Sequence, residues 1–89
     1  MNFTWDGAKR RANLSKHGLD FADAQWVFAG PTFTRPDTRF AYGEAPFSTV
    51  GLLGVEVVVI AHTETKDRIH IISMRKAERN EREYYFANL

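Results

Sequence analysis

The hydrophobic positions of the chain follow a helical period near the start, turn into dense β-branched runs in the middle, and end in a short amphipathic segment. A helix is predicted over residues 7–17, because Asp6 can cap its start and Gly18 can supply a left-handed stop. A second helix is predicted from Asp20 to Phe28. Its core-facing positions, at helical spacing, are Phe21, Ala24 and Phe28.

The middle of the chain predicts an antiparallel sheet. Residues 31–46 are rich in proline and predict turns around one short strand, and the β-branched runs that follow are separated by short turns. The strands are expected at residues 32–35, 47–53, 55–62 and 68–75. With a closing helix over residues 78–86, the fold class is α+β: two N-terminal helices, a three- to four-stranded antiparallel sheet and a C-terminal helix.

Composition fits a single domain over residues 1–89. Hydrophobic residues make up 44% of the chain, which is enough for a core. The absence of cysteine excludes disulfides and thiolate metal sites. No apolar run reaches the ~18–20 residues of a membrane span, and the first residues lack the character of a signal peptide. We therefore expect a cytoplasmic protein with no membrane association.

Charge is unevenly distributed, although the formal net charge is only +1. Residues 9–17 contain four cations, one histidine and no acid, so this stretch can face a polyanion. Residues 75–83 instead alternate cations with three glutamates, which is typical of a solvated helix with internal ion pairs. Dedicated nucleic-acid binders usually carry a larger positive charge, so a contact with nucleic acid must be local.

The side chains that can carry chemistry are histidine, lysine, arginine and tyrosine. The three histidines lack the short spacing of metal sites such as HExxH, so neither a metal nor another cofactor is expected. The sequence also lacks a GxSxG elbow and a Walker loop. Metal-free RNA cleavage needs a base for the ribose 2′-OH, an acid for the leaving 5′-oxygen and cations for the phosphoryl oxygens. The residue types present suit these tasks.

Arg75 is the strongest single candidate. It ends the last predicted strand beside the final helix, where its guanidinium can grip a phosphate with two hydrogen bonds. The alternative is a surface ion pair with Glu78 or Glu81. Lys16 and His17 end the first helix, where they can contact phosphate, with His17 as a base, or simply interact favourably with the helix dipole.

His62 follows a wholly apolar run, so it is either a hydrogen-bonded core or rim residue or a catalyst. If it pairs with His70, then Arg68, His70 and His62 lie on one face of the sheet. A slip of one residue places it opposite Ile69 instead.

Aromatic residues offer two further surfaces. Tyr84 and Tyr85 lie in the final helix, where one is expected to pack against the sheet and the other to present its hydroxyl outward or stack on a base. Trp26 lies off the line of core positions. It is expected either to be partly exposed, suited to a protein partner, or to cover the sheet edge.

Three segments combine into one pattern. The first contains Phe3-Thr4-Trp5-Asp6, Lys9, Asn13, Lys16-His17-Gly18, Phe21, Ala24 and Phe28. The second contains Gly43-Glu44, Val50-Gly51 and the strand from Val57 to His62-Thr63. The third runs from Arg68 to Ala77 and continues with Glu81 and Tyr84. In order and spacing, over nearly the whole chain, this pattern resembles the BrnT toxins of bacterial type II toxin–antitoxin systems.

The resemblance implies a RelE-like ribonuclease toxin neutralised by a BrnA antitoxin with a ribbon-helix-helix domain. The complex would repress its own operon, with DNA bound only through the antitoxin. The positions to test for catalysis or RNA contact are Lys16, His17, His62, Arg68, Arg75 and Tyr84. Further phosphate contacts are expected from Lys9 and Lys76.

The chain departs from the family pattern at three places. Ala45-Pro46 stands where the family usually has an arginine. If that arginine touches RNA, lower ribonuclease activity is predicted for this chain. Gly30 replaces an aspartate before the proline that follows the second helix. Glu78 replaces a threonine before the last helix, which predicts a less well capped helix start.

The sequence therefore predicts a metal-independent endoribonuclease that leaves a cyclic phosphate or 3′-phosphate and arrests growth. Arg75 stabilises the transition state, with Arg68 and Lys16 as electrostatic support. The base is His17 or His62, and the acid is Tyr84 or the other histidine. The alternative is a catalytically weak or inactive partner-binding module that acts mainly as a co-repressor in a DNA-binding complex.

Overall fold

The computed structural model describes residues 1–38 and 46–89. The Gly43-Glu44 pair and Ala45 of the sequence pattern lie outside the described residues. The elements, in chain order, are β1 (Asn2–Trp5), α1 (Gly7–His17), a 3₁₀ turn η1 (Phe21–Asp23), α2 (Ala24–Phe28), β2 (Thr32–Pro36), β3 (Phe47–Leu53), β4 (Glu56–Thr65), β5 (Arg68–Lys76) and α3 (Arg79–Ala87).

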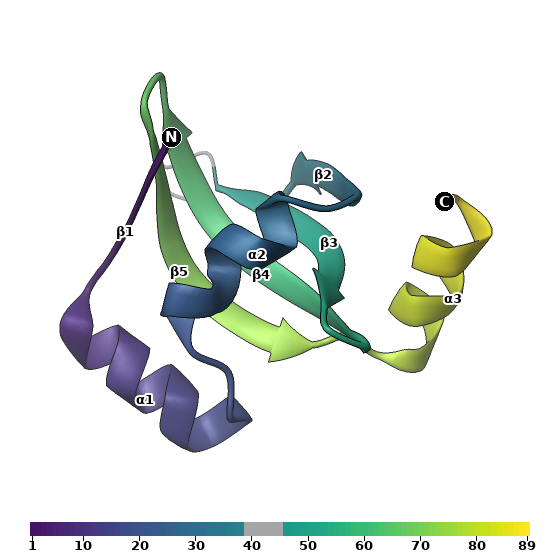
Figure 1. Ribbon diagram of the computed structural model, residues 1–89, viewed down its shortest axis with the longest axis horizontal. Coiled ribbons are helices and arrows are strands. Elements are labelled where there is room, and N and C mark those ends of the chain that lie inside the picture. The colour runs from purple at the N-terminus through teal and green to yellow at the C-terminus, as the bar shows by residue number, and fades with distance from the viewer. Residues whose placement is uncertain (39–45) are drawn as a thin grey trace.

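The strands form one sheet in the order β1-β5-β4-β3-β2 (Figure 1). Strands β2 to β5 pair antiparallel, as predicted, and the α+β class is confirmed. The sheet has a fifth strand, because β1 pairs parallel with β5 from Asn2 opposite Arg68 to Trp5 opposite Ile71. The sequence prediction missed β1, since four residues at a chain end carry too little pattern to indicate a strand.

The first helix forms as the sequence predicts. The Asp6 carboxylate accepts a hydrogen bond from the Lys9 backbone N–H at 2.9 Å, and Gly18 ends the helix with a φ of 68°. The second predicted helix is divided, because the Asp20 carboxylate accepts from the Ala22 N–H and a single 3₁₀ turn precedes α2.

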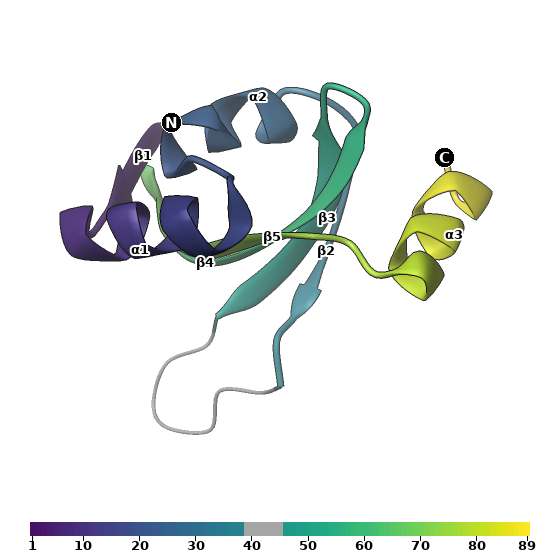
Figure 2. The ribbon, with the colours of Figure 1, turned by 90° about the horizontal axis from the view of Figure 1, so that it is seen from below.

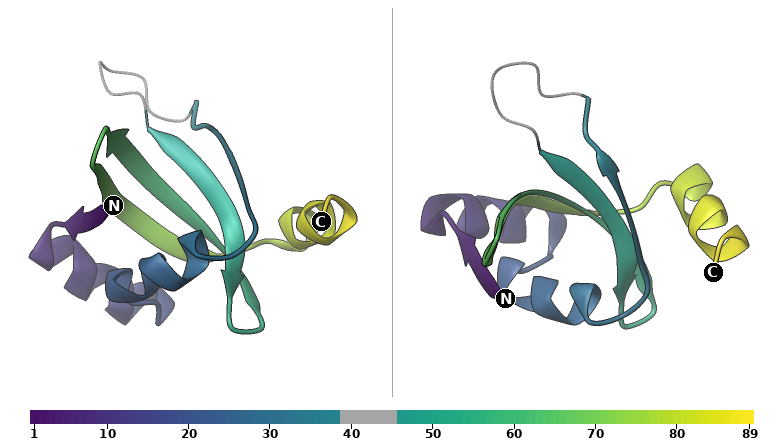
Figure 3. Two further views of the ribbon diagram at one scale, coloured as in Figure 1. Left: turned by 45° about the horizontal axis from the view of Figure 1, so that its top comes forward. Right: turned by 90° about the horizontal axis from the view of Figure 1, so that it is seen from above.

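The helices cover different faces of the sheet. Helices α1 and α2 lie on one face, while α3 stands beyond the outer strands on the other (Figure 2). The sheet between them is curved (Figure 3). The buried core on the α1 and α2 side contains Leu19, Phe21, Ala24, Val27, Val58, Ile60, Ile69, Ile71 and Met74. The smaller core under α3 contains Val57, Val59, Ala77 and Tyr85.

Helix α2 lies close against β3. A Cβ atom at Gly51 would come within 2.7 Å of Val27 Cγ1, so only glycine permits this approach without a shift of the helix. Phe28 packs against the same core, as predicted, and Val27 is fully buried beside it. Trp26 is 63% exposed on the outer side of α2, which confirms its expected exposure.

Strand β5 contains a β-bulge opposite the middle of β4. Ala61 pairs with Ser73, but His62 pairs with Ile71, so Ile72 is an additional residue. Both registers considered from the sequence are therefore wrong, since His62 lies opposite neither His70 nor Ile69.

The capping prediction for α3 is also corrected. The backbone N–H of Glu78 donates to Glu81 Oε1 at 2.7 Å, which is the glutamate half of a capping box. The helix start is therefore satisfied although Glu78 replaces threonine, because the residue that accepts this hydrogen bond is Glu81 rather than the capping residue itself.

Asn13 joins α1 to the open edge of β5. Strand β1 ends opposite Ile71, so the backbone at Met74 has no strand beside it on that side. The Asn13 amide fills this place: Nδ2 donates to the Met74 carbonyl at 2.9 Å, and Oδ1 accepts from the Met74 N–H at 3.1 Å. Nδ2 also donates to the Leu19 carbonyl. One buried side chain thus satisfies three backbone groups.

Asn13→Ala is expected to lower the free energy of unfolding by about 2 kcal/mol, because it leaves these buried backbone groups without partners. For a domain of this size, the melting temperature should fall by roughly 8–16 °C. Circular dichroism melting measures this, with Ser15→Ala on the exposed side of the same helix as the control. Equal melting temperatures for the two variants would contradict the assigned role.

Candidate functional site

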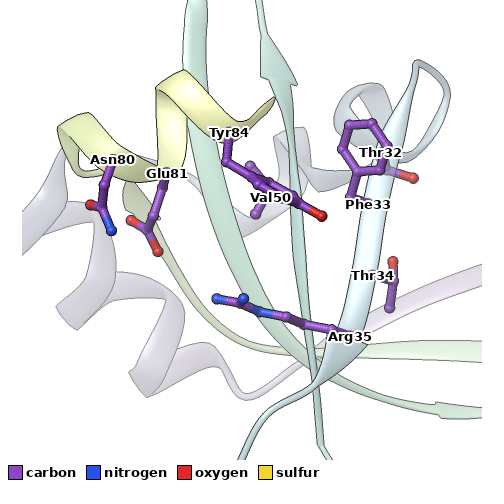
Figure 4. A pocket seen from close by; sticks show the side chains of 8 residues that line it. All are labelled: Thr32, Phe33, Thr34, Arg35, Val50, Asn80, Glu81 and Tyr84. Atoms are coloured by element: carbon purple, nitrogen blue, oxygen red, sulfur yellow. The ribbon is translucent and has the colours of Figure 1, made fainter. Parts of the chain in front are cut away.

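Two adjoining cavities lie between α3 and the outer strands of the sheet. The larger has a volume of about 530 Å³ and is lined by Thr32, Phe33, Thr34, Arg35, Val50, Asn80, Glu81 and Tyr84 (Figure 4). The smaller has a volume of about 450 Å³ and is lined by Arg35, Pro36, Asp37, Thr38, Ser48, Arg75 and Glu81. Arg35 and Glu81 line both, so the two cavities form one cleft.

The Arg75 guanidinium is held at the wall of this cleft by Glu81. Nη1 donates to Oε1 at 2.7 Å and Nη2 donates to Oε2 at 2.9 Å, which is the bidentate geometry of a strong ion pair. The ion pair that the sequence left as an alternative is therefore present, with Glu81 rather than Glu78 as the partner. Its existence does not exclude a phosphate role, because guanidinium recognises carboxylate and phosphate with the same fork.

Glu81 lies in a positive environment. The hydrogen bonds from Arg75 lower the pKa of its carboxyl most, and the Glu78 N–H and the nearby charge of Arg35 lower that pKa further. Figure 4 shows the Arg35 side chain extending from β2 toward Glu81 on α3. One carboxylate thus lies between two cations that come from different strands.

The strand register explains why these groups meet. Phe33 and Arg35 lie on the same side of β2, where they pair with Val50 and Ser48 of β3. On β5, Ile71 and Met74 both face the N-terminal helices, which the additional residue Ile72 makes possible. The next residue, Arg75, therefore faces α3.

The two tyrosines of α3 divide as the sequence predicts. Tyr85 is fully buried, and its hydroxyl donates to the Pro31 carbonyl at 2.7 Å. Tyr84 is 59% exposed and faces the larger cavity, with its ring centroid 6.2 Å from that of Phe33. Tyr84 is therefore the tyrosine that a ligand in the cleft can touch.

His62 lies on the opposite face of the sheet from the cleft. Its side chain has no exposed surface and packs between Phe28 and Phe47. Nε2 lies 2.6 Å from the Thr49 hydroxyl, while Nδ1 has no hydrogen bond and lies 3.5 Å from a Glu64 carboxylate oxygen. Burial lowers the pKa of His62 from 6.5 to about 4, so the ring is neutral at pH 7.

The remaining predicted site residues line neither cavity. Arg68 begins β5 and lies roughly 20 Å from Arg75 along the strand. Lys76 is exposed at the end of the same strand, near Glu56. Three others belong to α1, on the other side of the sheet: Lys9, Lys16 and His17. The structure thus brings Arg75 and Tyr84 together and leaves the others apart.

The basic stretch of α1 is partly neutralised. Arg10 donates to both carboxylate oxygens of Asp20, at 2.7 and 3.0 Å, and this pair lowers the pKa of the Asp20 carboxyl. The Arg10 guanidinium also lies 5.7 Å from the Trp5 ring centroid. Of the four cations in this stretch, one therefore fastens α1 to the η1 turn.

Sequence reasoning missed Arg35, Phe33 and Asn80 as site residues and considered Glu81 only as an ion-pair partner. Phe33 and Arg35 could have been grouped from the sequence, because side chains alternate between the two faces of the strand predicted at residues 32–35 and these two lie on the same face. What that face meets depends on the packing of α3, which no local pattern indicates.

Within residues 1–38 and 46–89, no three histidine, aspartate or glutamate side chains gather closely enough to bind a metal ion. Among the described helices, none combines the length and apolar character of a membrane span.

Comparison with protein families connects this geometry to a known class of protein. The family model for "Ribonuclease toxin, BrnT, of type II toxin-antitoxin system" matches residues 5–81. The chain belongs to the BrnT family. A search of curated proteins finds no match to the chain. As a BrnT toxin of a type II system, it has RNA as its substrate class and an antitoxin as its partner.

The BrnT match covers most of the cleft. It includes the two arginines that line the cleft, Arg35 and Arg75, and ends at Glu81, the residue that lies between them. Tyr84 lies three residues beyond the matched range, one turn further along α3.

Proposed function

We propose that the cleft between β2, β3 and α3 is the active site of a metal-independent endoribonuclease, with the scissile phosphate bound between Arg35 and Arg75. The observation that carries this proposal is the convergence of two guanidinium groups on one cleft, beside an exposed tyrosine. Fixed cations at the phosphoryl oxygens supply the charge stabilisation that the transition state needs. The BrnT match supports ribonuclease activity, and the cleft is the part of the described structure that best fits its chemistry.

Glu81 is our assignment for the general base. Its lowered pKa makes it a weak base while Arg75 binds it. A phosphate that takes over Arg75 removes the largest cause of that lowering, so substrate binding raises the basicity of Glu81. The carboxylate then accepts the proton of the ribose 2′-OH as the 2′-oxygen attacks phosphorus.

Tyr84 is our assignment for the general acid. Its hydroxyl gives a proton to the 5′-oxygen as the P–O5′ bond breaks, which leaves a 2′,3′-cyclic phosphate and a 5′-hydroxyl end. The exposed position of Tyr84 in the same cleft supports this role. The base differs from the one inferred from sequence, which was His17 or His62, whereas Tyr84 is one of the two acids considered there.

The histidines and the other cations take supporting roles in this proposal. His62 is a core residue, since its ring has no exposed surface and lies on the face away from the cleft. Lys16 and His17 on α1, together with Lys9, Arg68 and Lys76, lie outside the cleft and contribute at most a diffuse attraction to RNA.

We further propose that the toxin acts in the cytoplasm, arrests growth by cleaving RNA and is neutralised by a BrnA-type ribbon-helix-helix antitoxin. The complex binds operator DNA through the antitoxin. These steps rest on family membership. They are tested by expressing the chain alone and together with the adjacent partner gene.

RNA cleavage in excess EDTA is the direct test of the mechanism. The purified protein is expected to cut single-stranded RNA at an undiminished rate in EDTA and to leave 2′,3′-cyclic phosphate ends, because guanidinium groups replace a metal ion. Gel analysis with chemical mapping of the product ends measures both. Cleavage that stops in EDTA and returns with added divalent ions would sink the mechanism.

The alternative of a weak or inactive binding module is favoured by one observation. Arg75 is engaged by Glu81, so a phosphate must compete with a carboxylate that is already in place. A chain of this kind would cause no growth arrest on expression but would still bind its partner. Growth arrest that is relieved by the partner gene would instead support the hypothesis of an active toxin.

A further inference from the structure

The larger cavity has an apolar floor that the proposed cleavage chemistry does not use. Phe33 and Val50 form this floor from neighbouring strands, and the ring of Tyr84, whose hydroxyl is the proposed acid, lies over it from α3. Its volume of about 530 Å³ is within the range of pockets that bind small ligands. The residues proposed to bind the scissile phosphate adjoin this cavity, because Arg35 lines both cavities and Arg75 lines the smaller one.

Asn80 is the polar group best placed to read a ligand in this cavity. It precedes Tyr84 by four residues on α3, so the two side chains share one face of the helix, and both line the cavity. The Asn80 amide makes no hydrogen bond with another described residue, in contrast to Glu81 beside it. An amide presents a donor and an acceptor side by side, which is the arrangement that pairs with the edge of a nucleobase.

We propose that this cavity binds the nucleobase adjacent to the scissile phosphate, with Tyr84 stacking on the ring and Asn80 reading its edge. The inference rests on the proposed function, because the phosphate at Arg35 and Arg75 fixes which nucleotide enters. Single-stranded RNA suits the site, since its unpaired bases can leave the stack and lie on an aromatic side chain. Asn80 is then a specificity-determining residue.

The test is to map the cleavage sites of the purified protein on a randomised single-stranded RNA library by sequencing. The unaltered protein is expected to prefer one base at one position next to the cut. Asn80→Ala should reduce that preference roughly tenfold, because a paired donor and acceptor are lost and cleavage next to the preferred base slows toward the rate at the other bases. Asn2→Ala, on the far edge of the sheet, is the matched control and should keep the preference.

Tyr84 variants separate stacking from proton donation. Tyr84→Phe keeps the ring, so cleavage should slow without a change in base preference. Tyr84→Ala removes the ring as well, so weaker binding of all substrates is expected in addition.

The two proposals fail in different ways. If the protein does not cleave RNA, or if Arg75→Ala cleaves as fast as the unaltered protein, then the proposed function is wrong. If cleavage depends on Arg75 but no base is preferred, or if Asn80→Ala keeps the preference intact, then only the nucleobase pocket is wrong.

Discussion

Arg75→Ala is expected to lower the rate of RNA cleavage by about 10²–10³-fold, which is the usual cost of removing one fixed group that stabilises transition-state charge. The side chain lies at the wall of the cleft, where it donates two hydrogen bonds to Glu81. Its loss removes a charge at the phosphoryl oxygens and frees Glu81 from the hydrogen bonds that lower its pKa. Arg75→Lys should recover only a part of the rate, because an ammonium cannot form the bidentate contact.

The measurement is the initial rate of cleavage of a labelled RNA, with a melting curve for each variant to exclude unfolding. Arg79→Ala is the matched control. It removes the same charge from the start of α3, where Arg79 is exposed and paired with Glu83. A rate for Arg75→Ala within threefold of the Arg79→Ala rate would show that the cleft does not act through Arg75.

Acidification from pH 7 to pH 4 is expected to lower the free energy of unfolding by about 3 kcal/mol through His62, whose pKa falls from 6.5 to about 4 on folding. The folded-state pKa lies below the unfolded value, so between these limits the unfolded chain binds a proton that the folded chain rejects. Stability is therefore fully present above the unfolded pKa of about 6.5 and is lost as the pH falls toward 4. The cause is burial of the ring between Phe28 and Phe47.

Urea unfolding at several pH values measures this dependence. His62→Gln removes the titration and should flatten the curve between pH 6.5 and 4.5, although the variant starts from a lower stability. His17→Gln keeps the buried ring and should retain the slope. Glu81 and Asp20 have lowered pKa values, so their stabilising contribution is lost only as the pH falls further, below the ordinary glutamate and aspartate range. A flat curve for the unaltered protein over this window would contradict the burial argument.

Local signals predicted the elements of this fold well. Asp6 and Gly18 mark the ends of α1 because capping depends on neighbours a few residues away. The dense β-branched run of β4 indicated a central strand, and it lies third of five in the sheet. Strand β1 could not be found in the same way, because its formation depends on pairing with β5, more than sixty residues later.

The site was harder to predict, because it depends on how distant elements pack. Sequence reasoning selected Arg75 and Tyr84, which reach one cleft, but also Lys16 and His17, which do not. The cationic candidates were chosen because they lie at the end of a helix or strand. This criterion does not show on which face of the sheet a side chain lies. Arg35 was missed because the strand that carries it becomes important only once α3 packs beside it.

Ile72 matters through its presence in the chain rather than through its side chain. If β5 alternated without interruption from Ile69 and Ile71, then the arginine would point into the apolar layer beneath α1 and α2. A pairing slip that takes Ile72 into the regular ladder would therefore turn the strand inside out beyond that point and exchange a core methionine for a charged group, whereas deletion of Ile72 would leave Met74 two positions after Ile71 and keep both side chains on their present faces. The cleft and the core thus depend on one local irregularity, because the same bulge that turns Met74 inward turns Arg75 outward.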